Sequence, residues 1–174
     1  MIGHRVLVDG IMGSGKSTFA RALAARTGLQ VIHLDVHYWN PGWVRPSDDE
    51  WRERQQALLA GEAWIIDGSY NETLALRLEG ADTVVFLDSP WWSCAKRAVV
   101  RGLSKPGAEM PEGCEDSVSR RWRDEWGGVG RIWRHRRSEL AYARSEISRH
   151  GRHTTVHVLR SRREARALLG AICR

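Results

Sequence analysis

The sequence feature that most constrains this chain is Gly10-Ile11-Met12-Gly13-Ser14-Gly15-Lys16-Ser17. It matches G-x-x-x-x-G-K-[ST], the pattern of a phosphate-binding loop, or P-loop. An apolar run precedes the loop, and a helical pattern that stops near Thr27 and Gly28 follows it. Because a P-loop lies between a strand and the helix after it, this context favours a nucleotide site over a chance match.

The residue types in the loop suit the chemistry of a nucleoside triphosphate. Gly10 and Gly15 let the backbone turn and approach the phosphates, and Gly13 adds conformational freedom. Lys16 is expected to reach the β- and γ-phosphates, and the Ser17 hydroxyl to bind Mg²⁺. The sequence therefore predicts a purine nucleotide and Mg²⁺, bound by Gly10, Gly13, Ser14, Gly15, Lys16, Ser17 and Thr18.

Short apolar runs alternate with longer helical stretches along the 174 residues, which is typical of one α/β domain with a parallel sheet. Expected strands cover residues 4–9, 30–34, 63–67, 82–87 and 154–159. Expected helices run from the loop to Thr27, after an N-cap at Ser47, over 71–79, from an N-cap at Ser89 with Pro90 first in the helix, and over about 129–149.

Composition narrows the class of protein. No apolar run approaches the ~20 residues of a membrane span, and the N-terminus lacks the layout of a signal peptide, so a cytoplasmic protein is expected. Cys94, Cys114 and Cys173 form no metal-binding spacing, and we expect reduced thiols.

Charge is unevenly distributed. Residues 1–93 hold 8 Lys and Arg against 12 Asp and Glu (−4), whereas residues 94–174 hold 19 against 9 (+10). A basic half suggests an anionic partner, which charge alone does not resolve into nucleotide phosphate or nucleic acid.

Three aspartates, Asp35, Asp67 and Asp88, each follow an expected strand. Because ligands of open parallel sheets bind beyond the carboxyl ends of the strands, all three should face the P-loop. One such carboxylate can serve the metal and another can accept the proton of an attacking hydroxyl. We favour Asp67 for the metal and Asp35 for the acceptor, with the opposite assignment and a purely structural capping role both open. For Asp88, a structural role at the helix start is at least as good an explanation as a functional one.

Arg97 and Arg101 share one face of the helix expected after Asp88. They precede a segment rich in proline and glycine, with further arginines beyond it, which predicts a lid at about 102–128 that closes over the triphosphate. Arg97 and Arg101 are therefore candidate catalytic residues together with Lys16 and Asp35. A solvated basic surface is the simpler explanation for most arginines after residue 130.

Aromatic residues mark the stretch between the second strand and the next helix. Tyr38, Trp39 and Trp43 are expected to wall an acceptor pocket, with Tyr70 also facing the substrate. For any one tryptophan, ordinary packing is the favoured explanation.

The chain resembles adenylate kinase and other nucleoside-monophosphate kinases in its P-loop, its Asp67-Gly68 after the third strand and its Asp88-Ser89-Pro90. This resemblance implies a three-layer P-loop fold with a five-stranded parallel sheet ordered 2-3-1-4-5. It also implies Mg²⁺ near Asp67, ATP contacts from Arg97 and Arg101, and adenine near Arg160 and Ser161. The acceptor-binding arginine of that family is missing after Asp67, which puts an adenosine monophosphate acceptor in doubt.

A second resemblance, to FlaR-type DNA topology modulation proteins, covers nearly the whole chain. Its residues are GSGKST, VIHLDVHYWNPGW, WIIDGSYNETLALRLEGADTVVFLDSP, MPEGC and VLRSRREAR.

Three functions remain open from the sequence. The favoured one is an ATP-dependent phosphotransferase acting on a small hydroxyl- or phosphate-bearing acceptor. An ATPase acting on or regulated by DNA fits the FlaR-type resemblance and the basic half, but no helicase-like motif or strand-binding pattern supports it. The third is a nucleotide-binding regulator with little turnover. Nucleic acid is thus the less favoured partner, and the sequence does not indicate the oligomeric state.

Overall fold

The structure, a computed structural model, describes residues 2–103, 111–114, 137–138, 140–150 and 153–172, without the side chains of 101–103. Five parallel strands form one sheet in the order β2-β3-β1-β4-β5, which confirms the expected topology. They are β1 (Arg5–Gly10), β2 (Val31–His33), β3 (Trp64–Asp67), β4 (Thr83–Leu87) and β5 (Thr155–Leu159). Each lies within one residue of its predicted position.

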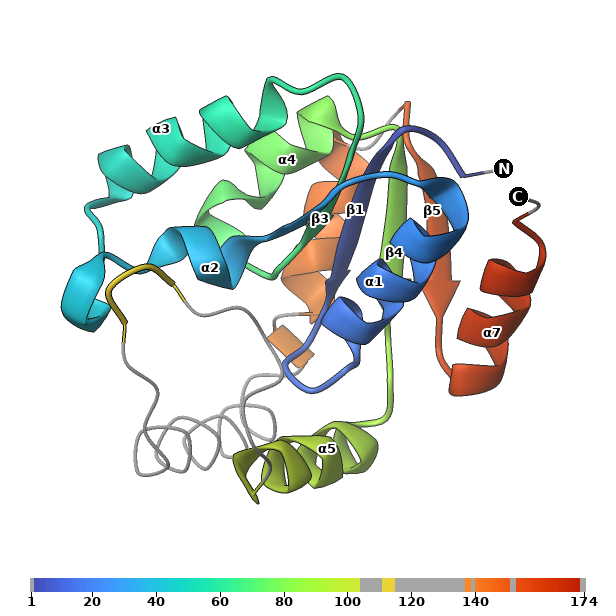
Figure 1. The fold of residues 1–174 in the computed structure, drawn as a ribbon. Coiled ribbons are helices and arrows are strands. Elements are labelled where there is room, and N and C mark those ends of the chain that lie inside the picture. Colours follow the sequence, from blue (N-terminus) through green and yellow to red (C-terminus); the bar gives the residue numbers. More distant parts are fainter. Residues whose placement is uncertain (1, 104–110, 115–136, 139, 151–152, 173–174) are drawn as a thin grey trace.

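Helices cover both faces of the sheet and make three layers (Figure 1). On one face lie α1 (Lys16–Thr27) and α7 (Arg162–Gly170), and on the other lie α3 (Asp48–Leu59), α4 (Leu74–Gly80) and a helix over residues 140–150. The alternation of β1 explains this division, because Val6 and Val8 pack with α1 whereas Leu7 packs on the opposite face. No helix in the described ranges is long and apolar enough to cross a bilayer.

Helix ends follow the predicted signals in most cases. α1 ends at Gly28 in the left-handed conformation, and the Ser47 hydroxyl caps α3 by accepting a hydrogen bond from the Glu50 amide at 3.2 Å. The expected helix over 71–79 is divided into η2 (Asn71–Thr73) and α4.

One helix start was predicted wrongly. α5 (Trp91–Leu103) begins one residue later than expected, with the Pro90 carbonyl accepting from the Cys94 amide at 3.1 Å. The Ser89 hydroxyl donates to the Ser14 carbonyl at 3.3 Å, so it connects the chain before α5 to the P-loop.

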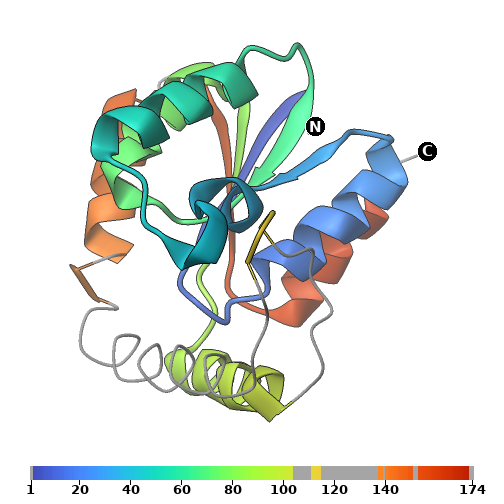
Figure 2. The same cartoon turned by 60° about the vertical axis from the view of Figure 1, so that its left-hand side comes forward.

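The stretch predicted as a loop after β2 contains α2 (Leu34–Tyr38) and the short η1 (Pro41–Trp43). Asn40 and Val44 pair around η1, so residues 40–44 form a small hairpin. Residues 111–114 lie against this hairpin (Figure 2), where the Gly42 amide donates to the Gly113 carbonyl at 3.0 Å. The rest of the predicted lid after α5, at 104–110 and 115–128, lies outside the described residues, as does the first part of the helix expected over 129–149.

Candidate active site

The P-loop has the backbone shape that its glycines predict. Gly10, Gly13 and Gly15 all have positive φ, at 145°, 73° and 103°. The Ser14 amide donates to the Ile11 carbonyl at 3.0 Å, and α1 then begins directly after Gly15. The Lys16 ammonium donates to the carbonyls of Gly10 at 2.8 Å and Ile11 at 3.2 Å, so it lies within the loop. The loop and the helix N-terminus together form an anion site.

Helix α5 touches the tip of this loop. A Cβ on Gly13 would lie only 2.5 Å from the Cys94 carbonyl oxygen, so glycine is required both for space and for its φ. The Arg97 Nε donates to the Gly13 carbonyl at 2.6 Å. The structure thus brings Arg97 to the P-loop, as its predicted role requires. Arg101 lies one turn further along α5, and its side chain is outside the described part of the chain.

Asp67 ends β3 beside the P-loop, at the carboxyl edge of the sheet. Its Oδ2 lies 2.8 Å from His33 Nδ1 on β2, and the two residues are paired in register. The side chain is 4% exposed, and its Oδ1 is buried with no hydrogen-bond partner among the described residues. A buried carboxylate oxygen without a donor suits a water or a cation, so Asp67 fits the predicted Mg²⁺ role.

A second buried aspartate, Asp9, was not predicted. It is 3% exposed at the end of β1 and accepts from the Gly10 amide at 2.7 Å and from the Ser69 hydroxyl at 2.6 Å. The Ser69 Oγ also lies 2.7 Å from the Gly10 carbonyl oxygen, which Lys16 contacts as well. Ser69 therefore ties the loop after β3 to the P-loop.

Asp35 lies in the first turn of α2 and is exposed. The Tyr70 hydroxyl donates to its Oδ1 at 2.7 Å. Burial, followed by the neighbouring Asp35 charge, raises the pKa of Tyr70 well above its usual range, so the phenol stays protonated as the donor. We call α2, the hairpin 40–44 and the loop 67–70 the acceptor side, and the P-loop with α5 the nucleotide side.

Comparison with solved structures finds proteins that share this fold. The chain is similar to shikimate kinase from Acinetobacter baumannii, solved with shikimate, at a TM-score of 0.56 and 17% identity, covering 97% of this chain and 90% of that one. It is similar to the YorR protein of Bacillus subtilis, solved with phosphorylated GDP, at 0.51 and 18% over 95% and 93%. Shikimate kinase from Aquifex aeolicus matches at 0.54 and 16% over 97% and 93%.

The chain shares its fold with these proteins, including the parallel sheet ordered β2-β3-β1-β4-β5. At these identities the likeness concerns the fold and not the acceptor. No family model matches the chain, and no curated protein matches it either. The FlaR-type resemblance is therefore not shown by the comparisons.

The predicted aromatic residues gather on the acceptor side of the P-loop kinase fold. Tyr38 packs against Trp39 with ring centroids 5.0 Å apart and against Tyr70 at 4.6 Å, and Trp39 packs against Trp43 at 5.8 Å. Trp51 of α3, which was not predicted, completes the cluster. Tyr38 is buried in the core, so packing accounts for its ring, whereas Trp39 and Trp43 are partly exposed.

A buried arginine, Arg77 of α4, supports the loop that carries Tyr70. Its guanidinium is fully buried and donates to the Tyr70 carbonyl at 2.9 Å, to Gln55 Oε1 at 3.1 Å and to Thr73 Oγ1 at 3.2 Å. Burial lowers its pKa to about 10, and the charge of Asp9 is the largest opposing effect. Arg77 thus stays charged at neutral pH and holds the backbone next to Ser69.

The remaining predicted residues lie at the carboxyl ends of β4 and β5. Asp88 forms an ion pair with Arg144 at 3.2 Å, and a role for Asp88 at the start of α5 stays a prediction. Ser161 caps α7 by accepting from the Glu164 amide at 3.2 Å, and Glu164 in turn accepts from the Arg160 amide at 2.8 Å. Both Arg160 and Ser161 therefore lie at the edge of the sheet where a nucleotide would bind, and their contact with adenine stays a prediction.

Five residues of the site were missed from the sequence: Asp9, His33, Trp51, Ser69 and Arg77. The rule that selected three aspartates after strands applies equally to Asp9, so a signal for that residue existed. His33, Ser69 and Arg77 are defined only by contacts across the fold, which no local pattern reveals.

Proposed function

We propose that this chain is an ATP-dependent phosphotransferase that moves the γ-phosphate of Mg·ATP to a small hydroxyl- or phosphate-bearing acceptor. The observation that carries the proposal is the Ser69 link between the P-loop and the loop before Tyr70. It holds the Lys16 ammonium and the Asp35–Tyr70 pair on one continuous framework, as transfer between two bound molecules requires.

The proposed step is a displacement at the γ-phosphorus. The acceptor oxygen loses its proton to Asp35 and forms a bond to phosphorus, the bond to the β–γ bridging oxygen breaks, and ADP leaves with that electron pair. Lys16, Arg97 and the loop amides stabilise the negative charge that moves onto the phosphates, with Arg101 proposed beside them. Arg160 and Ser161 are proposed to lie beside adenine.

Ser17 and Asp67 are the residues that would hold Mg²⁺, through the hydroxyl of Ser17 and the unpartnered Oδ1 of Asp67. The ion, when bound, neutralises charge on the β- and γ-phosphates. Asp67 is itself oriented by His33, which fixes the direction of its other oxygen.

A DNA-dependent ATPase related to the FlaR-type proteins is the second candidate, because residues 94–174 carry a net charge of +10.

A cytoplasmic location is part of the first proposal, since ATP and reduced thiols are both found there. Cys94 and Cys114 are buried thiols.

The test is ADP release from Mg·ATP by the purified full chain, measured alone, with duplex or single-stranded DNA, and with nucleosides, monophosphates and sugars. Lys16→Ala is the blank, and Lys96→Ala, an exposed lysine on α5, is its matched control. Stimulation by a small molecule that is lost in the blank supports a phosphotransferase. Stimulation by DNA alone contradicts it.

A further inference from the structure

The acceptor side presents oxygen atoms that accept hydrogen bonds. Asp35 is an exposed carboxylate that accepts a hydrogen bond from the Tyr70 hydroxyl, whereas the buried carboxylate of Asp67 on β3 is assigned to Mg²⁺ in the proposal above. His33 contributes an imidazole and not a further carboxylate, and this imidazole contacts Asp67. Carboxylates accept hydrogen bonds from hydroxyl and ammonium groups and repel phosphates.

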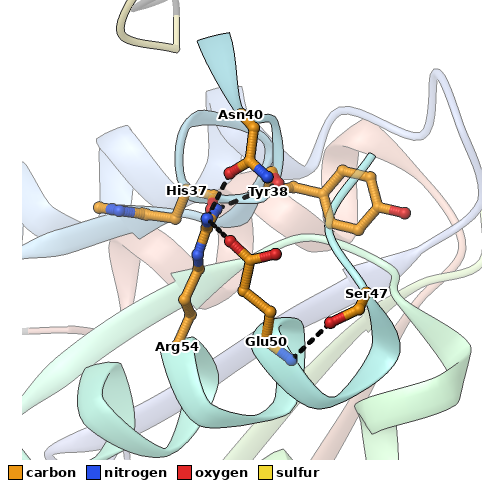
Figure 3. Close-up of polar contacts among 6 residues, drawn as sticks. All are labelled: His37, Tyr38, Asn40, Ser47, Glu50 and Arg54. Carbon is orange, nitrogen blue, oxygen red and sulfur yellow. Dashed lines mark hydrogen bonds and ion pairs between the residues drawn. The ribbon is translucent and has the colours of Figure 1, made fainter. Parts of the chain in front are cut away.

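Among the described residues, Arg54 contacts α2 directly, and its hydrogen bonds there go to backbone carbonyls. Figure 3 shows the Arg54 guanidinium beneath the end of α2, where it donates to the carbonyls of His37 at 3.1 Å and Tyr38 at 3.4 Å. It also bonds the side chains of Asn40 and Glu50. Arg54 thus caps the negative end of α2, and Glu50 balances its charge.

The other described arginines near the acceptor side are buried, form an ion pair or line a separate cavity. Arg77 is fully buried, and Arg45 pairs with Asp48 at 3.2 Å. Arg45 and Arg52 line a cavity of about 240 Å³ between α2, α3 and η2 that no P-loop residue reaches. Three carboxylates also line that cavity, those of Asp48, Asp49 and Glu72, so it too is net negative.

We infer, resting on the phosphotransferase proposed above, that the acceptor is a polyhydroxylated molecule without a phosphate group, neutral or cationic, that binds Asp35 through its hydroxyl or ammonium groups. A nucleoside monophosphate places a charge of about −1.5 to −2 beside Asp35. A nucleoside, a sugar or an amino sugar instead supplies hydrogen-bond donors for this carboxylate. The Trp39 and Trp43 rings flank the same side and suit the flat or apolar face of such a molecule.

The test uses acceptors in matched pairs with Mg·ATP: adenosine with AMP, cytidine with CMP, and glucose with glucose 6-phosphate. Comparing glucosamine with glucose distinguishes a preference for a cationic acceptor from a preference for a neutral one. Products are detected by the mass of the added phosphoryl group, with Lys16→Ala as the blank. We expect the member without phosphate to be used with a kcat/KM at least about 100-fold higher.

The outcomes separate the two proposals. Transfer mainly to AMP, CMP or glucose 6-phosphate overturns this inference and keeps the phosphotransferase. Transfer to no member of the panel, with ATP hydrolysis stimulated by DNA, overturns the phosphotransferase itself.

Arg54→Gln provides a second test of phosphate binding, because Arg54 is a described cation that contacts α2 directly. If Arg54 only caps the helix, the variant melts at a lower temperature and keeps the same preference within each pair. A selective loss of the phosphorylated member in Arg54→Gln assigns phosphate binding to Arg54 and overturns the inference.

Discussion

The Lys16 ammonium contacts carbonyls five and six residues before it, whereas the Asp35 carboxylate receives its hydrogen bond from Tyr70, 35 residues further along the chain. The nucleotide side is thus built mostly from one short segment and its backbone. The acceptor side is built from side chains of α2, the hairpin 40–44 and the loop 67–70, which the pairing of β2 with β3 brings together. Phosphate binding can therefore be inferred from local sequence, and acceptor choice depends on contacts between distant segments.

The largest expected effect is on the nucleotide side. Lys16→Ala removes a cation from the transferring phosphates, and its kcat should fall by about 100-fold or more with an unchanged fold. ADP release measures kcat, and thermal unfolding shows whether the fold is unchanged. Lys96→Ala, on the exposed surface of α5, should keep full turnover, and equal losses in both variants would contradict a specific role for Lys16.

Gly13→Ala tests the contact between the P-loop and α5. Its Cβ would lie 2.5 Å from a backbone oxygen of Cys94 at a φ of 73°, so the free energy of unfolding should fall by about 2 kcal/mol or more. Urea denaturation measures this loss. Gly170→Ala is the control, because a Cβ there meets no atom within 4 Å and the residue lies in a helix. That control should be neutral or more stable by up to about 1 kcal/mol.

Alkaline pH tests the environment of Tyr70 on the acceptor side. Its pKa is raised in the folded chain, so above about pH 10 the unfolded state binds fewer protons than the folded state, and stability falls as pH rises. One proton contributes at most about 1.4 kcal/mol per pH unit.

Tyr70→Phe lacks this proton and should lose less stability than the natural chain between pH 10 and 11. Arg77, whose pKa is about 10 in the fold, has the opposite effect; because the Tyr70 charge raises the Arg77 pKa, its removal in Tyr70→Phe acts in the same direction and also reduces the loss of stability. Identical pH profiles from urea denaturation would show that Tyr70 titrates normally.

The smallest expected effect concerns Ser161. Loss of its cap in Ser161→Ala should lower the free energy of unfolding by about 1 kcal/mol. If the hydroxyl only caps α7, the KM for ATP should stay within about twofold, as measured by ADP release. A larger rise in KM would favour the predicted contact with adenine over a purely structural role.

The same contrast explains what the sequence could predict. The strands, α1 and the Ser47 cap of α3 follow local patterns of apolar residues, glycine and capping residues, and each was predicted to within a residue or so. α2 was missed because its five residues directly follow β2, with no turn between them to mark a new element. His33 and Ser69 were missed because their roles depend on Asp67 and Asp9, which are neighbours only in the folded chain.

One measurement tests the division between the two sides most directly: the ATP dissociation constant and the acceptor turnover of Asp35→Asn, determined on the same sample with the most active acceptor of the panel. We expect ATP to bind as in the natural chain while kcat falls by about 100-fold or more, because the proposed general base is removed. Loss of ATP binding together with turnover, or full turnover in the variant, would contradict the assignment of Asp35 to the acceptor.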